Sequence, residues 1–269
     1  MTNSTLSKLI GLLLLTLFSF NQTHLFAQDV AIPVIDQDAV RRCESIFPVE
    51  VKDPSNVGGW FLEKGNLCLF GSLASQDLSQ LNYELDLSDV EVVITMSPGG
   101  PVDAWLAWAR ALGDIKPVLI VDRICGSSCA NYLVPIARQV LAVEGSLIVW
   151  HGGPTSVPAL LKLGLSDSIA RLETETEELY FSAGVSSDIL NYATKEYSGD
   201  LLGFLAANQD LGVTEVAGYS FAPETLKTCF GFQNVDFLWH PGGDAEVFLA
   251  GQKLSKSLVL LESPTEDCE

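Results

Sequence analysis

Three short segments of this chain carry residue types that could do covalent chemistry. They are residues 97–100 (SPGG), 125–130 (CGSSCA) and 150–153 (WHGG). A serine hydroxyl beside a histidine base can attack a carbonyl, and nearby backbone amides can hold the oxyanion that forms. The glycine pair lets a backbone amide approach a ligand without a side chain in the way. Together the segments predict a serine-hydrolase-like site, with a serine of the pair Ser127–Ser128 as the nucleophile and His151 as the base.

The scarcity of histidine limits the choice of base. The chain has three histidines, and only His151 and His240 lie beyond residue 27. His240 belongs to a late turn, whereas His151 ends a predicted buried strand, where side chains of α/β sheets are well placed for function. A Ser–Lys dyad is an alternative, but the nearest lysines, Lys116 and Lys162, both have the character of surface residues.

Each of the three segments follows a predicted strand. The predicted strands span 90–96, 118–121, 139–143 and 147–150, and predicted helices span 102–112 and 126–135. Alternation of strands and helices predicts an α/β fold built on a parallel or mixed sheet.

The remaining segments show weaker patterns. We expect one or two strands in 59–70, a helix over 71–86 and mainly helical structure over 155–212. The predicted organisation is a signal peptide at 1–27, a polar lead-in at 28–58, a single α/β domain at 59–261 and an acidic tail at 262–269.

The N-terminus has the layout of a secretory signal peptide. Residues 9–20 form an apolar run after the single charge of Lys8, and Ala27 supplies a small residue for cleavage. The run is about a dozen residues long, short of the roughly 20 that a spanning helix needs. No later segment is long and apolar enough to cross a membrane. We therefore expect a periplasmic or secreted protein without a stable membrane span after cleavage.

The cysteine content agrees with export. All six cysteines lie beyond residue 27, and an oxidising compartment would allow three disulfides. Six cysteines permit many pairings, of which we favour Cys43–Cys68, Cys125–Cys129 and Cys229–Cys268. No metal site is expected, because no Cys-x-x-Cys pair occurs and few histidines are available.

The formal net charge is −19 at pH 7. Such an acidic surface repels nucleic acid phosphates and anionic lipid headgroups, so we expect no nucleic-acid partner. The charge is that of a simply acidic soluble protein, and it indicates little about mechanism.

The ordered series of strand–SPGG–helix, strand–CGSSCA–helix and strand–His resembles the Clp-type serine peptidases and the wider crotonase-like superfamily. In that group the SPGG strand contributes an oxyanion-hole amide, and the catalytic serine lies in a small-residue turn at a helix start. The catalytic histidine ends a later strand, and here His151 follows Ser127 by 24 residues. The resemblance covers residues 88–154 well and 219–236 weakly, and the Cys-x-Ser-x-Cys arrangement looks like exported bacterial relatives.

The resemblance implies a ClpP/crotonase-like fold of repeated β-β-α units, with a helical segment after the histidine. It implies that Ser127 is the nucleophile and His151 the base, and Ser128 stays open as the alternative nucleophile. It also implies an oxyanion hole made by the amides of Gly99 and Ser128, with Gly100 supporting the turn.

The acid that orients the histidine in this family does not map cleanly onto the chain. Asp200, Asp210 and Glu215 are the candidates, and we favour Asp200. Without an orienting acid, a Ser–His dyad would be slower or inactive. The segments that dock an ATP-driven unfoldase in the family have no evident counterpart.

Two functions of different classes follow. The first is an exported, ATP-independent serine peptidase or related acyl hydrolase that acts on a peptide or protein without a cofactor. The second is a catalytically silent relative that binds a peptide or partner protein in the same cleft. Acyl-CoA chemistry is disfavoured because CoA is a cytoplasmic cofactor. A homo-oligomer stays open, since Clp-type peptidases assemble into rings.

Overall fold

The computed structural model describes residues 34–46, 58–73, 86–154, 166–199, 216–256 and 258–265. Contacts within the chain divide it into residues 1–33 and residues 34–269, and every described residue belongs to the second unit. The predicted signal peptide and the candidate acids Asp200, Asp210 and Glu215 lie outside the described residues.

The described residues form an α/β structure. Its strands are β1 (Gly59–Glu63), β2 (Asn66–Phe70), β3 (Val92–Ser97), β4 (Val118–Gly126), β5 (Gln139–Ala142), β6 (Leu147–Val149), β7 (Gly218–Tyr219) and β8 (Leu260–Leu261). Its helices are α2 (Gln37–Ile46), α4 (Val102–Gly113), α5 (Ser128–Ile136), α7 (Ser166–Ala183), α8 (Asp188–Tyr192), α10 (Pro223–Phe230) and α11 (Gly243–Leu254). In the described part of the chain, no helix combines the length and apolar character needed to cross a bilayer.

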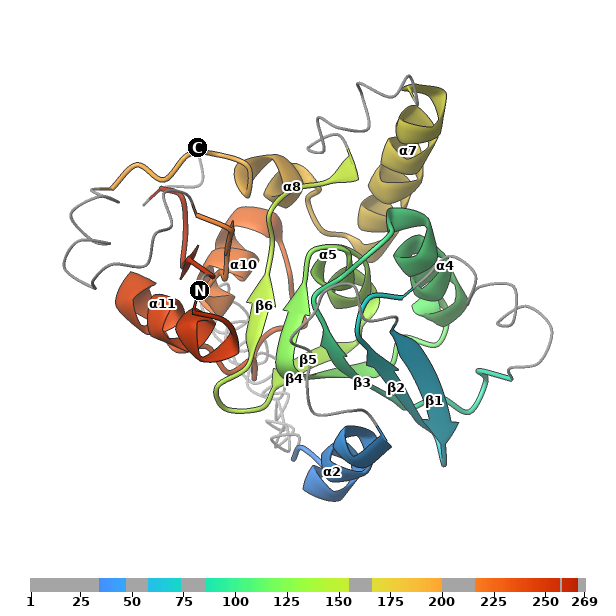
Figure 1. Ribbon diagram of the computed structural model, residues 1–269. Helices are drawn as coiled ribbons and strands as arrows, with labels where there is room; N and C mark the ends of the chain where they lie inside the picture. Colours follow the sequence, from blue (N-terminus) through green and yellow to red (C-terminus); the bar gives the residue numbers. More distant parts are fainter. Residues whose placement is uncertain are drawn as a thin grey trace, which may run out of the picture. The chain divides into compact units, whose positions relative to one another are not determined.

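The main sheet is mixed and has the strand order β1-β2-β3-β4-β5, with β6 also paired to β4 (Figure 1). Only the β1–β2 pair is antiparallel; β2, β3, β4, β5 and β6 pair in parallel. The predicted α/β class with a parallel or mixed sheet is therefore confirmed.

A kink divides β4 into two halves. Arg123 has φ +63°, and the register with β3 shifts between Thr95, which pairs with Val121, and Ser97, which pairs with Cys125. The first half of β4 pairs with β5 and the second half with β6. Because the extra residues turn the strand, its second half reaches a different neighbour, and β4 runs to Gly126 instead of ending at the predicted residue 121.

The two faces of the sheet pack against different helices. Alternate strand residues such as Leu67, Val93 and Leu119 are buried in one core cluster with α4, α5 and α7. The residues between them, such as Cys68, Ile94 and Ile120, are buried against α2 in a second cluster. This alternation is the two-residue period of a strand, and covering both faces explains why the strands are continuously apolar (Figure 1).

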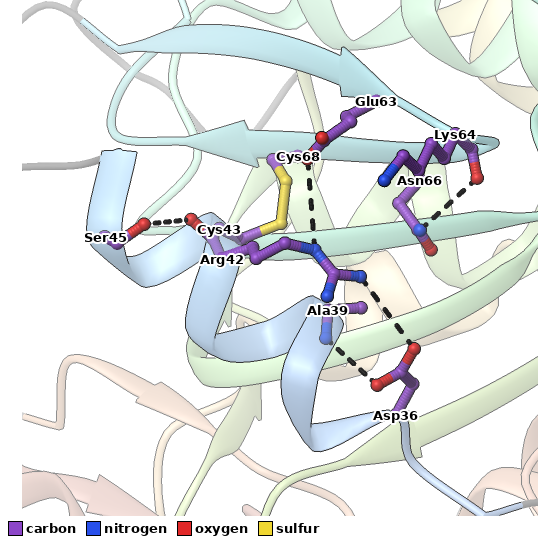
Figure 2. The surroundings of a disulfide bond; sticks show 9 residues. All are labelled: Asp36, Ala39, Arg42, Cys43, Ser45, Glu63, Lys64, Asn66 and Cys68. Atoms are coloured by element: carbon purple, nitrogen blue, oxygen red, sulfur yellow. Dashed lines mark hydrogen bonds and ion pairs between the residues drawn. A yellow bond between two sulfur atoms is a disulfide. The ribbon is translucent and has the colours of Figure 1, made fainter.

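Helix α2 lies within the predicted polar lead-in, where we predicted no helix. Its N-terminus is capped by Asp36, whose carboxylate accepts hydrogen bonds from the amides of Asp38 (2.9 Å) and Ala39 (3.0 Å). Cys43 forms a disulfide with Cys68 of β2, with a Cα–Cα distance of 5.8 Å (Figure 2). This bond ties a short, otherwise marginal helix to the sheet.

One further expectation differs from the structure at its described ends. Of the predicted helix over 71–86, residues 71–73 and 86 are not helical, and residues 74–85 lie outside the described residues. The predicted tail begins in contact with α8, because the Tyr192 hydroxyl contacts the hydroxyls of Ser263 (3.1 Å) and Thr265 (2.5 Å).

Asp122, at the kink of β4, should oppose stability at neutral pH. The residue is buried, its Oδ2 has no hydrogen-bond partner among the described residues, and burial followed by the nearby Glu44 raises its pKa to about 6. The folded state therefore binds the proton more tightly than the unfolded state, whose pKa is about 3.9. The stability that this proton gives is present below the unfolded pKa and is lost as the pH rises through about 6.

Asp122→Asn is accordingly expected to raise the free energy of unfolding by roughly 1–3 kcal/mol at pH 8, and by much less at pH 4. Urea unfolding of both proteins at the two pH values measures the difference. An equal gain at both pH values would contradict the electrostatic explanation.

Candidate active site

The three segments that carry potentially reactive residues (97–100, 125–130 and 150–153) meet at one edge of the sheet. β3 ends at Ser97, β4 at Gly126 and β6 at Val149. Ser97 pairs with Cys125, and Cys125 pairs with Ile148, so the carboxyl ends of three parallel strands lie in register. The residues that follow these ends are the SPGG turn, the Ser127 turn and His151. Strand ends of this kind are the usual place for function in α/β sheets.

Ser127 occupies a strained turn between β4 and α5. Its backbone has φ +54° and ψ −125°, which a residue with a side chain rarely adopts. Its amide donates to the Val149 carbonyl (2.8 Å), and its carbonyl accepts from the amide of Asn131 (2.9 Å). Strain of this kind costs about 1–3 kcal/mol and persists where the surroundings impose it, often at active sites.

A disulfide closes the turn that contains Ser127. Cys125 at the end of β4 is bonded to Cys129 in the first turn of α5, and both residues are fully buried. The strand pairing and the disulfide together hold the serine in place from both sides. The predicted helix start at residue 126 is therefore two residues early: Gly126 belongs to β4, Ser127 is the cap, and α5 begins at Ser128.

His151 follows β6 and faces Ser127. The preceding residue, Trp150, exchanges two backbone hydrogen bonds with Tyr219, at 2.9 and 2.8 Å, which fixes the end of the strand. The His151 side chain is exposed, and its Nε2 lies 2.7 Å from the Ser127 hydroxyl. That distance is within the reach required of a general base. The Ser128 hydroxyl points elsewhere and donates to the Gly100 carbonyl (2.8 Å).

The second ring nitrogen of His151 has no partner among the described residues. No described carboxylate forms a hydrogen bond or ion pair with His151. The candidate acids from the sequence, with Asp200 the favoured one, lie outside the described residues. The described part of the site is thus a Ser–His pair.

The predicted oxyanion-hole residues surround Ser127, but their amides differ in availability. The Gly99 amide donates to the Ser97 hydroxyl (3.0 Å). Ser128 is the first residue of α5, so its amide has no acceptor within the helix. The bond from Ser128 to the Gly100 carbonyl holds the SPGG turn against the start of α5. Of the two predicted oxyanion-hole amides, that of Ser128 is therefore the one without an acceptor inside its own helix.

The other candidate bases are structural or distant. His240 uses both nitrogens: Nε2 donates to the Ser220 carbonyl (2.7 Å) and Nδ1 accepts from the Gly242 amide (3.0 Å). Its burial lowers its pKa, and an Nδ1 that accepts a hydrogen bond carries no proton. Lys116 lies beside the carboxyl end of α5, where its carbonyl accepts from Arg138 Nη1 (3.4 Å), whereas Ser127 caps the amino end of that helix. Lys162 lies outside the described residues.

Two of the three predicted disulfides are present. Cys43–Cys68 and Cys125–Cys129 have Cα–Cα distances of 5.8 and 5.3 Å. Cys229 is also disulfide-bonded, and its predicted partner Cys268 lies outside the described residues. Within the described ranges, no group of three or more His, Cys, Asp or Glu side chains could hold a metal ion.

A surface cavity of about 790 Å³ lies away from Ser127. It is bordered by Arg110 near the carboxyl end of α4, Ile136 at the carboxyl end of α5, and Glu175 of α7. Ser127 caps the opposite, amino end of α5, so this cavity is not the place where Ser127 would meet a substrate.

The chain matches no protein-family model, no curated protein and no solved structure. The resemblance of residues 88–154 to the Clp-type peptidases therefore remains a hypothesis from the sequence. The inference of function depends on the geometry around Ser127 and His151.

Proposed function

We propose that this protein is an exported, ATP-independent serine peptidase or related acyl hydrolase with a site of the Clp-type, crotonase-like kind. The observation that carries the proposal is the 2.7 Å hydrogen bond between His151 Nε2 and the Ser127 hydroxyl. The strained backbone of Ser127 at a strand–helix junction supports it, because such strain gathers at reactive residues.

The proposed chemistry is two-step acyl transfer. His151 takes the hydroxyl proton as Ser127 attacks a peptide or ester carbonyl, and the Ser128 amide binds the oxyanion that forms. The Gly99 amide would serve as a second donor only if it left the Ser97 hydroxyl, which itself donates to the Gly71 carbonyl. His151 then returns the proton to the leaving group, and water releases the acyl group by the same steps. Asp200 is the proposed orienting acid.

Export is part of the same proposal. Structural disulfides form and persist in oxidising compartments, and the structure contains Cys43–Cys68 and Cys125–Cys129. Both bonds are compatible with an extracellular protein whose signal peptide ends near Ala27. The second disulfide brackets the proposed nucleophile, so an oxidising compartment would also favour an intact site.

A silent binding protein is the second candidate, and two observations favour it. No described carboxylate orients His151, and the Gly99 amide is engaged by Ser97. A site with these features could bind a peptide in the same place without turning it over.

A labelled fluorophosphonate, which reacts covalently with activated serines, separates the two candidates. We expect the wild-type protein to be labelled under non-reducing conditions, and Ser127→Ala to lose all labelling. Ser128→Ala is the matched control, because it removes a hydroxyl that bonds Gly100 and leaves Ser127 and His151 in place. Labelling is read by gel fluorescence, and the modified peptide by mass spectrometry.

The other outcomes of the labelling experiment identify a different nucleophile or favour the binding protein. Labelling that survives Ser127→Ala but is lost in Ser128→Ala would assign the nucleophile to Ser128. No labelling of folded wild-type protein with intact disulfides would support the binding protein instead.

A further inference from the structure

We propose that Asn131 is the positioning residue that sets the geometry between Ser127 and His151. The inference rests on the proposed function, since it assigns how that Ser–His pair is held. Asn131 lies one turn into α5, four residues after Ser127. It is a buried polar residue, with 3% of its surface exposed, in a helix whose later residues are mostly apolar.

Asn131 bonds to both halves of the site. Its backbone amide donates to the Ser127 carbonyl at 2.9 Å. Its side-chain Nδ2 donates to the carbonyl of Gly152 at 2.8 Å, directly after His151. One residue therefore connects the turn that carries the nucleophile to the loop that carries the base.

The Asn131 side chain contains a buried polar atom that lowers the stability of the fold. Its Oδ1 is buried and has no hydrogen-bond partner among the described residues. A buried amide with one unmet acceptor is less favourable than an apolar side chain of the same shape, so an unsatisfied group calls for an explanation. The hydrogen bond to Gly152 is that explanation, because it restrains a loop residue at φ +122°, a conformation that residues with a side chain rarely adopt.

The arrangement compensates for what the described site lacks. In Ser–His–Asp sites an acid on the second nitrogen orients the ring. Here no described acid reaches His151, and the exposed ring is instead held through its backbone. Trp150 is paired with Tyr219 on one side of His151, and Gly152 is held by Asn131 on the other.

The test compares Asn131→Ala with a matched control, Asn234→Ala. The Asn234 Nδ2 also donates to main-chain carbonyls, those of Val134 and Ala137, both at 2.8 Å, but at the opposite end of α5. Both variants should lower the melting temperature. Only Asn131→Ala should slow the maximal rate of fluorophosphonate labelling, by about 10–100-fold, with little change in the concentration for half-maximal rate.

Nuclear magnetic resonance of the histidine rings gives a readout that needs no activity. The mature chain is expected to hold only His151 and His240, so each ring can be followed by itself. Ser127→Ala defines the signal of a His151 ring without its partner. Asn131→Ala should move the His151 signal toward that position and leave His240, which bonds Ser220 and Gly242, unchanged.

The two proposals can fail separately. If wild-type protein is not labelled, the proposed function fails, and the His151 signal still decides the role of Asn131. If folded Asn131→Ala labels at the wild-type rate with an unchanged His151 signal, the positioning role is wrong. Should Asn131→Ala not fold, the similarly shaped Asn131→Leu, which has no hydrogen-bond donor on its side chain, is measured against the same controls.

Discussion

Replacing His151 with alanine is expected to slow fluorophosphonate capture and the hydrolysis of a p-nitrophenyl ester by about 10³-fold or more. The reason is that Nε2 of this ring lies 2.7 Å from the Ser127 hydroxyl and is the proposed base for that proposed nucleophile. An unassisted serine hydroxyl is a weak nucleophile at neutral pH. Stopped labelling reactions and absorbance assays measure the two rates.

His240→Asn is the control for loss of a histidine. It disturbs a half-buried ring that bonds Ser220 and Gly242 and forms no hydrogen bond with Ser127 or His151, so it should lower the melting temperature and leave the labelling rate close to that of the wild type. Asp200→Asn tests the proposed orienting acid. A loss of about 10⁴-fold in labelling rate relative to the wild type would add Asp200 as the third catalytic residue. Wild-type labelling of His151→Ala would rule out His151 as the base.

Gly99→Ala is expected to disable the site by contact with the nucleophile itself. A Cβ added to Gly99 would lie 2.7 Å from Ser127 Cβ and 2.6 Å from the Gly126 carbonyl oxygen, at a φ of +105° that alanine avoids. The Ser127 turn is closed by a disulfide and paired to β6, so it cannot yield without moving the hydroxyl. A misplacement of about 1 Å can cost 10²-fold in rate, and we expect at least that loss in labelling.

Gly113→Ala is the matched control for this substitution. A Cβ at Gly113, the last residue of α4, would meet nothing within 4 Å. It should be neutral or stabilise the protein by up to about 1 kcal/mol, with unchanged labelling. Near-wild-type labelling of Gly99→Ala would show that the SPGG turn does not approach Ser127 closely enough for the added Cβ to meet Ser127 Cβ.

The strands and helices that frame the site could be predicted because their patterns are local. The β-branched run before Ser97 and the apolar spacing of residues 102–112 correspond to β3 and α4. The extension of β4 to Gly126 could not be predicted, because it follows from the kink at Arg123 and from pairing with β6. Those are contacts between residues far apart in sequence.

Helix α2 was missed although local signals were present. Asp36 is an N-cap residue, and Val40 and Cys43 have the spacing of one buried helical face. Because only a few residues of α2 are apolar, the segment has the composition of a polar lead-in. The sheet that these residues cover, and the Cys43–Cys68 bond that fixes the helix to it, are known only from the tertiary structure.

The sequence by itself determined which residue types are available to the site and in what order they follow strands. It restricts the histidine base to His151 or His240, and it places small residues around Ser127. Only the tertiary structure decided that Ser127, and not Ser128, faces His151, that Ser97 engages the Gly99 amide, and that Asn131 reaches Gly152. The physical reason is that the partner of each of these side chains depends on the strand register and on the strained turn at Ser127. Contacts between residues far apart in sequence impose both.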